Sequence, residues 1–202
     1  MKKIIFNDNY METNCYLLEF DGSALVIDPT KSFDLLPKGV KQKIKGVFIT
    51  HGHFDHFEAL ESYKNKNITF YMHKKCFEKV SNSLKNCSYM GYKKLEVNLK
   101  EEKVVFLKEN DIINDFEKEI KVIELFGHTD CSLGFIIDYD IFCGDAIFLG
   151  SIGRTDLYSG NFNEMKKTTK KVKQIKENYT IYPGHGDITT LDNEKKNNYY
   201  FK

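Results

Sequence analysis

The sequence of 202 residues lacks any apolar stretch of the roughly 20 residues needed to cross a membrane. Lys2 and Lys3 follow the first methionine, but no apolar segment of the kind found in signal peptides comes after them. Cysteines are few: there are five, an odd number, scattered along the chain with no C-x-x-C pair. This pattern argues against a disulfide framework and for a reducing compartment. We therefore expect a cytoplasmic protein with no membrane partner.

Charge of one sign is not in excess either. The chain has 30 Lys and Arg residues against 29 Asp and Glu residues, a formal net charge of +1. Nucleic-acid-binding proteins usually have a basic surplus, so no nucleic-acid partner is expected. The one local basic run, residues 166–173, is best interpreted as a solvated helix face. Motifs of serine hydrolases, P-loop proteins and dinucleotide-binding proteins are also absent, so any catalytic nucleophile must come from elsewhere.

The distribution of apolar residues indicates many short strands mixed with several helices. Strands are predicted at residues 14–20, 23–28, 45–50, 68–71, 103–107, 119–125, 133–138, 141–143 and 180–182, and helices at 57–63, 73–80, 163–178 and 192–199, with a weak one at 33–37. Asp21-Gly22 predicts a hairpin between the first two strands. Residues 81–103 show no clear pattern. This mixture favours a layered α/β domain with two sheets between helices, and no repeat or linker divides residues 1–202.

What the sequence does contain is a cluster of histidines in the segment T-H-G-H-F-D-H, residues 50–56. Three of the six histidines, His51, His53 and His56, lie in this one turn together with Asp55. The turn follows a predicted strand, where an α/β sheet usually places its site. Residues two apart in extended backbone share a face, so the side chains can converge. Imidazole and carboxylate groups are ligands for zinc, iron or manganese.

Three later turns each place one more ligand-type residue beside glycine at the end of a predicted strand. They are Gly127-His128, Gly144-Asp145 and Gly184-His185. Glycine allows backbone to pass close to a metal or a substrate. The resulting seven candidate ligands exceed what one tetrahedral ion uses and suit two ions if one carboxylate bridges. Two ions about 3.5 to 4 Å apart can share a hydroxide that is nucleophilic near neutral pH. The sixth histidine, His73, has no partner motif and is interpreted as a surface or helix-start residue.

These motifs, in this order, resemble the metallo-β-lactamase superfamily. The stretch Gly144–Asp156 (GDAIFLGSIGRTD) and the closing stretch from Tyr182 (YPGHGDITT) are similar to small glyoxalase II-like hydrolases. The resemblance implies a four-layer αββα sandwich. It implies that His51, His53 and His128 hold a first metal and that Asp55, His56 and His185 hold a second, with Asp145 bridging them.

The resemblance also suggests roles around the metals. Asp28 would orient a ligand from behind, or simply end its strand before Pro29. Arg154 would hold a substrate carboxylate, or form a structural ion pair with Asp156. The family usually continues G-H-T-P-G, whereas this chain reads G-H-T-D-C-S from Gly127, so the pocket is expected to differ there. Cys131 would be a buried spectator rather than an extra ligand or a redox-sensitive thiol.

The function implied is hydrolysis of a thioester of a small thiol, such as S-lactoylglutathione, by a metal-bridging hydroxide, with Asp55 and Asp145 as catalytic residues. Larger glyoxalase II enzymes have an added helical domain that grips glutathione, and we do not expect one here. Two divalent ions are expected, zinc first, with iron or manganese as alternatives. The rival function is a persulfide dioxygenase with one iron on His51, His128 and Asp145. A non-enzymatic domain with a relict site is a third, weaker alternative, because competent residues occupy all seven positions.

Overall fold

The computed structural model describes residues 1–7, 9–91 and 93–202. The first half of the chain forms a six-stranded sheet whose strands lie in sequence order. They are β1 (Lys2–Phe6), β2 (Cys15–Glu19), β3 (Ala24–Ile27), β4 (Ile44–Phe48), β5 (Thr69–His73) and β6 (Val104–Leu107). Strands β1 to β3 pair antiparallel, and the pairs β3–β4, β4–β5 and β5–β6 are parallel. The predicted hairpin over Asp21-Gly22 is confirmed by the β2–β3 pairing.

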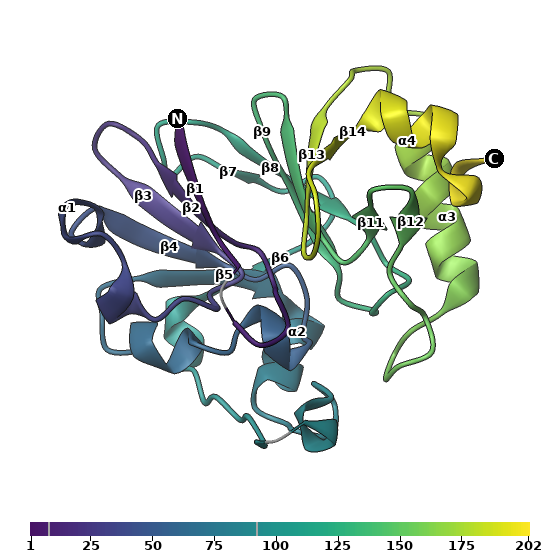
Figure 1. Ribbon diagram of the computed structural model, residues 1–202. Coiled ribbons are helices and arrows are strands. Elements are labelled where there is room, and N and C mark those ends of the chain that lie inside the picture. The colour runs from purple at the N-terminus through teal and green to yellow at the C-terminus, as the bar shows by residue number, and fades with distance from the viewer. Residues whose placement is uncertain (8, 92) are drawn as a thin grey trace.

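The second half of the chain forms another six-stranded sheet, in the order β14-β13-β10-β9-β8-β7. Its strands are β7 (Ile112–Ile113), β8 (Ile120–Glu124), β9 (Leu133–Ile137), β10 (Asp140–Gly144), β13 (Thr180–Pro183) and β14 (Thr189–Thr190). A small hairpin, β11 (Ile147–Phe148) and β12 (Ser151–Ile152), stands beside it. In Figure 1 the first sheet runs from purple to teal and the second from teal-green to yellow.

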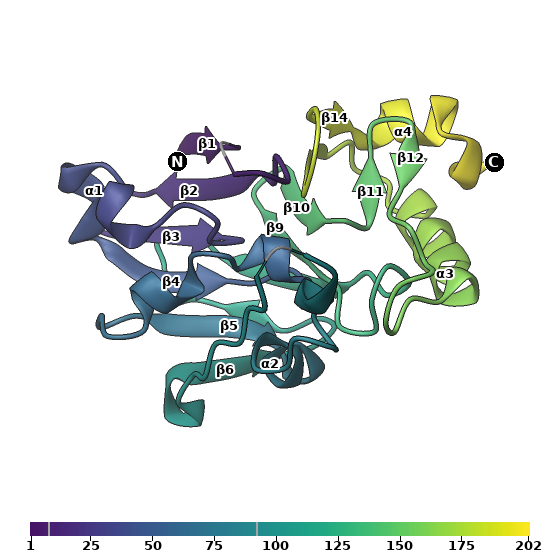
Figure 2. The ribbon, with the colours of Figure 1, turned by 60° about the horizontal axis from the view of Figure 1, so that its bottom comes forward.

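Helices cover the outer faces of both sheets (Figures 1 and 2). Helices α1 (Lys38–Lys41) and α2 (Lys74–Val80) lie on the side of the first sheet, and α3 (Phe162–Lys173) and α4 (Leu191–Asn197) on the side of the second. Short 3₁₀ turns complete the layers: η1 (Phe33–Leu35), η2 (Phe54–His56), η3 (Leu60–Tyr63), η4 (Ser88–Met90), η5 (Glu101–Lys103) and η6 (Tyr199–Phe201). None of the helices among the described residues is long and apolar enough to span a membrane.

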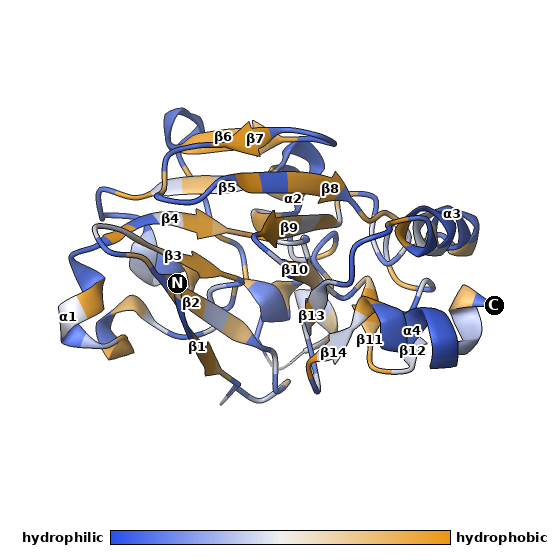
Figure 3. Ribbon diagram, turned by 90° about the horizontal axis from the view of Figure 1, so that it is seen from above, coloured by the Kyte–Doolittle hydropathy of each residue, from blue (hydrophilic) through white to orange (hydrophobic). Residues whose placement is uncertain are grey.

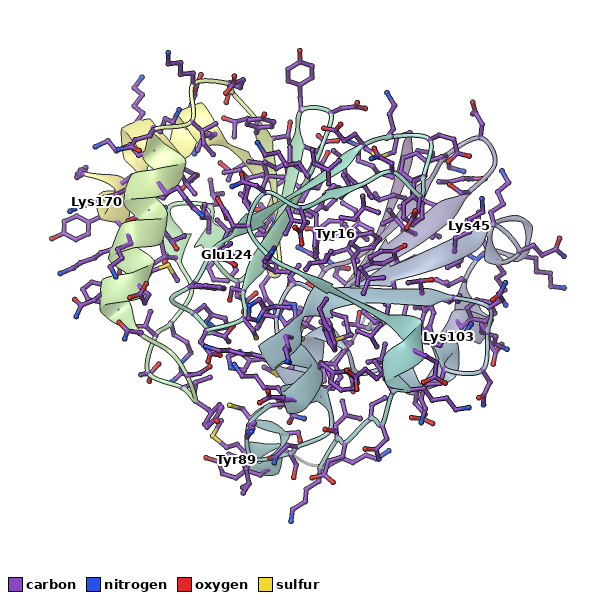
Figure 4. All side chains as sticks on the ribbon, turned by 180° about the vertical axis from the view of Figure 1, so that it is seen from behind. Tyr16, Lys45, Tyr89, Lys103, Glu124 and Lys170 are labelled. Atoms are coloured by element: carbon purple, nitrogen blue, oxygen red, sulfur yellow. The ribbon has the colours of Figure 1, made fainter. Side chains whose placement is uncertain are left out.

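Three apolar layers hold this arrangement together, because neighbouring strand residues face opposite sides of a sheet. Leu17 packs between the first sheet and its helices, whereas Leu18 packs between the two sheets with Phe135 and Phe142. A third cluster, including Val172 and Leu191, joins the second sheet to α3 and α4. Figure 3 shows apolar strands between outer helices whose exposed faces are hydrophilic, and Figure 4 shows Tyr16 within the molecule. The expected four-layer α/β architecture is confirmed.

Several predicted elements differ from the structure. The predicted helix at residues 57–63 is wrong, since η2 and η3 occupy this region. Phe57, Leu60 and Tyr63 are fully buried at a spacing of three, which suits 3₁₀ turns better than an α-helix. The helix predicted at residues 163–178 ends at Lys173, because the amides that follow bond to carbonyls three residues back. His73 is the N-cap of α2, as predicted for a helix-start histidine, and accepts from the Lys75 amide.

Candidate metal centre

The predicted ligands come together at one end of the two sheets. Each follows a strand or lies in the turn after it: residues 51–56 after β4, His128 after β8, Asp145 after β10 and His185 after β13. Their ligand atoms form three groups, in each of which all atoms lie within 4.8 Å of one another. The groups are His51, His53 and His128; Asp55, His56 and His185; and His51, His56 and Asp145.

The first group is a cage of three buried imidazoles. The ring centroids of His53 and His128 are 4.5 Å apart, and that of His51 lies 4.9 and 4.8 Å from them. His53 Nδ1 and His128 Nε2 face each other at 2.8 Å. Three converging nitrogens of this kind are a common ligand set for catalytic zinc.

The second group joins two imidazoles to a carboxylate, and Asp145 lies between the groups. Asp55 Oδ2 is 3.2 Å from His185 Nε2 and 3.6 Å from His56 Nε2. Asp145 Oδ1 lies 3.2 Å from His56 Nε2, and its Oδ2 lies 3.5 Å from His128 Nε2 and 3.6 Å from His185 Nε2. A carboxylate that reaches ligand atoms of both groups occupies the position of a bridge.

Hydrogen bonds behind the ligands fix which nitrogen of each ring faces the centre. The Nδ1 atoms of His128 and His185 lie 2.7 and 3.1 Å from the backbone oxygens of Arg154 and Met11. Because a carbonyl oxygen only accepts, these Nδ1 atoms are protonated, and the Nε2 lone pairs point inward. Such partners fix the tautomer and orientation of metal-binding histidines.

Asp28 acts in the same way on both groups. Its Oδ2 accepts from His56 Nδ1 at 2.8 Å and from Thr50 Oγ1 at 2.7 Å, and its Oδ1 accepts from the Thr50 amide at 2.8 Å. Since the Thr50 hydroxyl proton is used on Asp28, His51 Nδ1 must donate to Thr50 Oγ1, 3.1 Å away. Asp28 therefore orients His56 directly and His51 through Thr50.

The protonation states of the first group and of the carboxylates suit a metal, since a metal binds neutral imidazoles and ionised carboxylates, whereas His56 must give up a proton when a metal binds. Burial lowers the pKa of His51 and His128 and brings that of His53 to about 3, so these rings are neutral near pH 7. Although burial opposes it, the pKa of Asp145 is lowered, chiefly by His56. Burial would likewise lower the pKa of His56, but three carboxylates, Asp145 first, hold it well above the usual value.

Buried atoms without hydrogen bonds give an independent test of the fit. Among the described residues, the fully buried side-chain nitrogens and oxygens that lack a hydrogen-bond partner all belong to this cluster. They are His51 Nε2 and His53 Nε2, together with His56 Nε2 and Asp145 Oδ1, which lie 3.2 Å apart without forming a hydrogen bond. Leaving such atoms unpaired is costly, and proteins rarely do so without an ion or a functional reason. The residues present fit a two-metal centre.

Glycines allow the loops to approach this closely. A Cβ on Gly184 would lie 2.1 Å from Asp145 Oδ1 and 2.5 Å from His56 Cε1. Gly144 has a φ of 51°, and its Cβ would meet Thr50 Oγ1 at 2.4 Å. Any side chain at these positions would therefore displace the groups that form or support the centre.

Two further predicted positions have structural partners. The guanidinium of Arg154 pairs with the Asp156 carboxylate through two hydrogen bonds of 2.7 and 2.8 Å, although the residue also lines the cavity in front of the centre. Cys131 is fully buried and belongs to none of the three ligand groups. Its Sγ lies 3.5 Å from the amine of Lys79, itself only 3% exposed and also bonded to Asp130.

Sequence reasoning missed Thr50 and Lys79. Thr50 directly precedes the first ligand, but nothing in its type or spacing shows that its hydroxyl relays a hydrogen bond. Lys79 looks like any other lysine of a helix, and only the structure shows that it is buried against Gly52, between two ligands of the first group.

Comparison with known proteins agrees with this geometry. Residues 9–185 match the family model of the metallo-beta-lactamase superfamily. This chain belongs to the metallo-β-lactamase superfamily. Hydroxyacylglutathione hydrolase 1 of Vibrio vulnificus is 31% identical over 190 residues, covering 93% of this chain but 65% of that protein, less than two thirds of its length. Hydroxyacylglutathione hydrolase GloC of Haemophilus influenzae is 26% identical, covering 93% of this chain and 92% of that protein.

Among solved structures, BLEG-1 B3 metallo-beta-lactamase superposes with a TM-score of 0.87 and 23% identity, covering 100% of both chains. At this identity, the likeness shows the fold alone. The superfamily and the clustered His and Asp residues together indicate a metal-dependent hydrolase with a site for two metal ions.

Proposed function

We propose that this protein hydrolyses thioesters in the manner of glyoxalase II, with two divalent metal ions, zinc in both positions. The observation that supports this most is the complete set of seven ligands, with Asp145 placed between two groups. Relatives named hydroxyacylglutathione hydrolase, which match over 93% of this chain, support the choice of a thioester.

The ligand types are ones that zinc accepts in both positions. The first group offers three imidazole nitrogens, and the second offers two imidazoles and a carboxylate. When bound, such ions lower the pKa of water to about 7 and polarise a carbonyl oxygen, which provides both a nucleophile and an electrophile.

The residues of the chain hold and orient the parts of this reaction. Asp145 reaches both groups and keeps them at a fixed separation, and Asp28 holds the ligand rings from behind. Burial would raise the pKa of Asp55, but the nearby His56 and His185 lower it, with the charge of His56 having the larger effect. An ionised carboxylate that also faces the cavity can accept a proton from an attacking water.

Arg154 sits at the wall of the cavity in front of the centre. We propose that it contacts the substrate, with Asp156 holding the guanidinium in one orientation through its two hydrogen bonds. Because the pair is exposed, a substrate carboxylate can approach the guanidinium without displacing a buried partner.

The test combines metal analysis with a thioesterase assay on the same purified protein. We expect two zinc ions per chain. We also expect hydrolysis of S-lactoylglutathione, which is monitored by the appearance of the free thiol. Asp145→Ala should abolish turnover, because it removes the bridge, whereas Asp34→Ala, which removes an exposed carboxylate in η1, should leave turnover unchanged.

One iron per chain together with oxygen consumption on a persulfide would instead establish the dioxygenase. Full thioesterase activity in the Asp145→Ala protein would contradict the proposed mechanism.

A further inference from the structure

The metal centre opens into a cavity of about 1380 Å³ whose walls are largely apolar. Beyond the metal ligands, the apolar side chains that line it are Tyr10, Met11, Phe54, Met90, Leu95, Phe148 and Leu157. Several of them are open to solvent: Met90 is 55% exposed and Met11 is 44% exposed. Exposed apolar side chains gathered around one opening commonly mark a binding site.

One wall is a loop that has almost no regular structure but is held by buried hydrogen bonds. The side-chain amide of Asn86, fully buried, donates to the carbonyl oxygens of Lys79 at 3.1 Å and Leu95 at 2.9 Å. Its Oδ1 accepts from the Ser88 amide at 2.9 Å, and Ser88 Oγ accepts from the Leu95 amide at 2.9 Å. Leu95 is therefore tied to Asn86 and Ser88, and the Met90 amide bonds to the Cys87 carbonyl at 3.2 Å.

This wall reaches the metal ligands themselves. Phe54, the residue after His53, donates its amide hydrogen to the Asn86 carbonyl at 3.1 Å. A Cβ built on Gly91 would lie 3.6 Å from Phe54 Cζ, so the ring lies against the backbone of the same loop. An apolar surface thus begins beside a metal ligand and extends to the mouth of the cavity.

Another part of the lining is tied to the second metal group. The carbonyl of Met11 accepts a hydrogen bond from His185 Nδ1, and the ring of Phe148 lies 6.3 Å from that of His185, centroid to centroid. Apolar side chains therefore lie beside ligands of both metal groups.

Charged groups in the cavity are few and mostly engaged. Glu58 accepts from Asn9, and Arg154 is paired with Asp156. Of the charged side chains that line the cavity within the described residues, Lys93 alone has no ion-pair or hydrogen-bond partner. Arg154 and Lys93 can each meet a substrate carboxylate, but most of the lining beyond the metal ligands is apolar, and an apolar chain would leave water for that surface.

We propose that the natural substrate has an apolar chain of several carbons, bound against Met90, Leu95, Tyr10 and Met11. This inference rests on the proposed thioesterase function and narrows its substrate class. The chain can belong to the acyl group or to the thiol, because apolar side chains lie beside ligands of both metal groups.

The experiment varies the two halves of the thioester separately on the metal-loaded protein. One series has acyl chains from acetyl to octanoyl on N-acetylcysteamine, and the other has acetyl on alkanethiols of increasing length. Each buried methylene contributes about 0.8 kcal/mol, so kcat/KM should rise about fourfold per methylene along one series until the cavity is full. The series that rises identifies the half that bears the chain.

Matched variants on the same loop test where the chain lies. Met90 is 55% exposed, and a long substrate chain would bury this exposed apolar surface. Met90→Ser removes that surface and should lower the ratio of long-chain to short-chain kcat/KM by about fivefold. Leu84→Ser is the control: Leu84 is 64% exposed on the same loop but does not line the cavity, so the ratio should not change.

Binding without turnover gives a second readout. The thioether S-octyl-N-acetylcysteamine cannot be hydrolysed and should bind with a negative heat-capacity change that is smaller in the Met90→Ser protein. Hydrolysis that is independent of chain length in both series, or an unchanged ratio in Met90→Ser, overturns the apolar substrate and leaves the thioesterase intact. No hydrolysis of any thioester, including S-lactoylglutathione, overturns both.

Discussion

Replacement of Asp28 tests the metal centre most directly, because this one carboxylate supports ligands of both groups. It accepts hydrogen bonds from the Thr50 amide, the Thr50 hydroxyl and His56 Nδ1. Asp28 has a φ of 51°, and asparagine is among the few residues that tolerate this left-handed backbone. Asp28→Asn therefore removes the charge and one acceptor while preserving size and backbone.

The expected loss follows from the number of hydrogen bonds that an amide can keep. Only one of the two terminal atoms of asparagine accepts, so at least one buried donor loses its partner. Hydrogen bonds to charged groups contribute about 1.5–3 kcal/mol each, so the free energy of unfolding of the metal-free protein should fall by about 2–4 kcal/mol. An amide nitrogen facing His56 also favours the tautomer that has the proton on Nε2, the ligand atom. Metal affinity should fall by about 10- to 100-fold.

Competition with a chromophoric chelator measures the affinity for each ion, and urea denaturation in excess chelator measures the unfolding free energy. Asp34→Asn, which changes an exposed carboxylate in η1, is the control and should behave like the parent protein. If Asp28→Asn binds both ions as tightly as the parent and unfolds at the same urea concentration, the role assigned to this carboxylate is wrong.

Three further outcomes follow from the same geometry. Gly184→Ala should lose metal and activity, because its Cβ would lie 2.1 Å from Asp145 Oδ1. A Cβ on Gly39 would meet nothing within 4 Å, so the control Gly39→Ala should retain both metal content and kcat, which are the quantities measured. Each ion present at 1000 times its dissociation constant should add about 4 kcal/mol to the free energy of unfolding, which removal of the ion takes away. A chelator titration monitored by thermal unfolding measures this, and an unchanged Tm would contradict it. The metal-free protein should be most stable near pH 6.5. Below this pH, stability falls because His51, His53 and His128, whose pKa values are lowered, take up protons only on unfolding. Above it, stability is lost as pH rises through the raised pKa values of His56 and His185. Urea titrations across this pH range measure the free energy of unfolding, and a flat profile would refute this.

Much of the centre could be predicted because its residues are local in sequence or lie beside glycine. Four ligands occupy residues 51–56, and the other three follow glycines at strand ends, so strand prediction alone placed them at one edge. The supporting contacts could not be predicted in this way. The bonds of His128 and His185 to the backbone oxygens of Arg154 and Met11 depend on where distant loops fold, and a backbone oxygen has no sequence pattern.

Secondary structure was predictable where runs of apolar residues mark a strand. It was not predictable where contacts between distant residues determine the backbone conformation. The strands with β-branched and aromatic residues, such as β4 and β8, lie where they were predicted within a residue or two. Residues 81–103 showed no pattern, and within them side-chain hydrogen bonds join Asn86 and Ser88 to Leu95. The apolar wall of the cavity was therefore invisible to sequence reasoning, although Met90 and Leu95 belong to it.

The division of the chain between two sheets has a consequence for how the protein matures. The residues that would hold metal come from both halves: His51 to His56 from the first sheet, and His128, Asp145 and His185 from the second. Neither half alone presents a full set of donors, so tight capture of the ions must wait until the sheets have docked. A nascent chain released before its last strand is made would hold neither ion firmly, and metal content thus reports whether synthesis and docking have been completed.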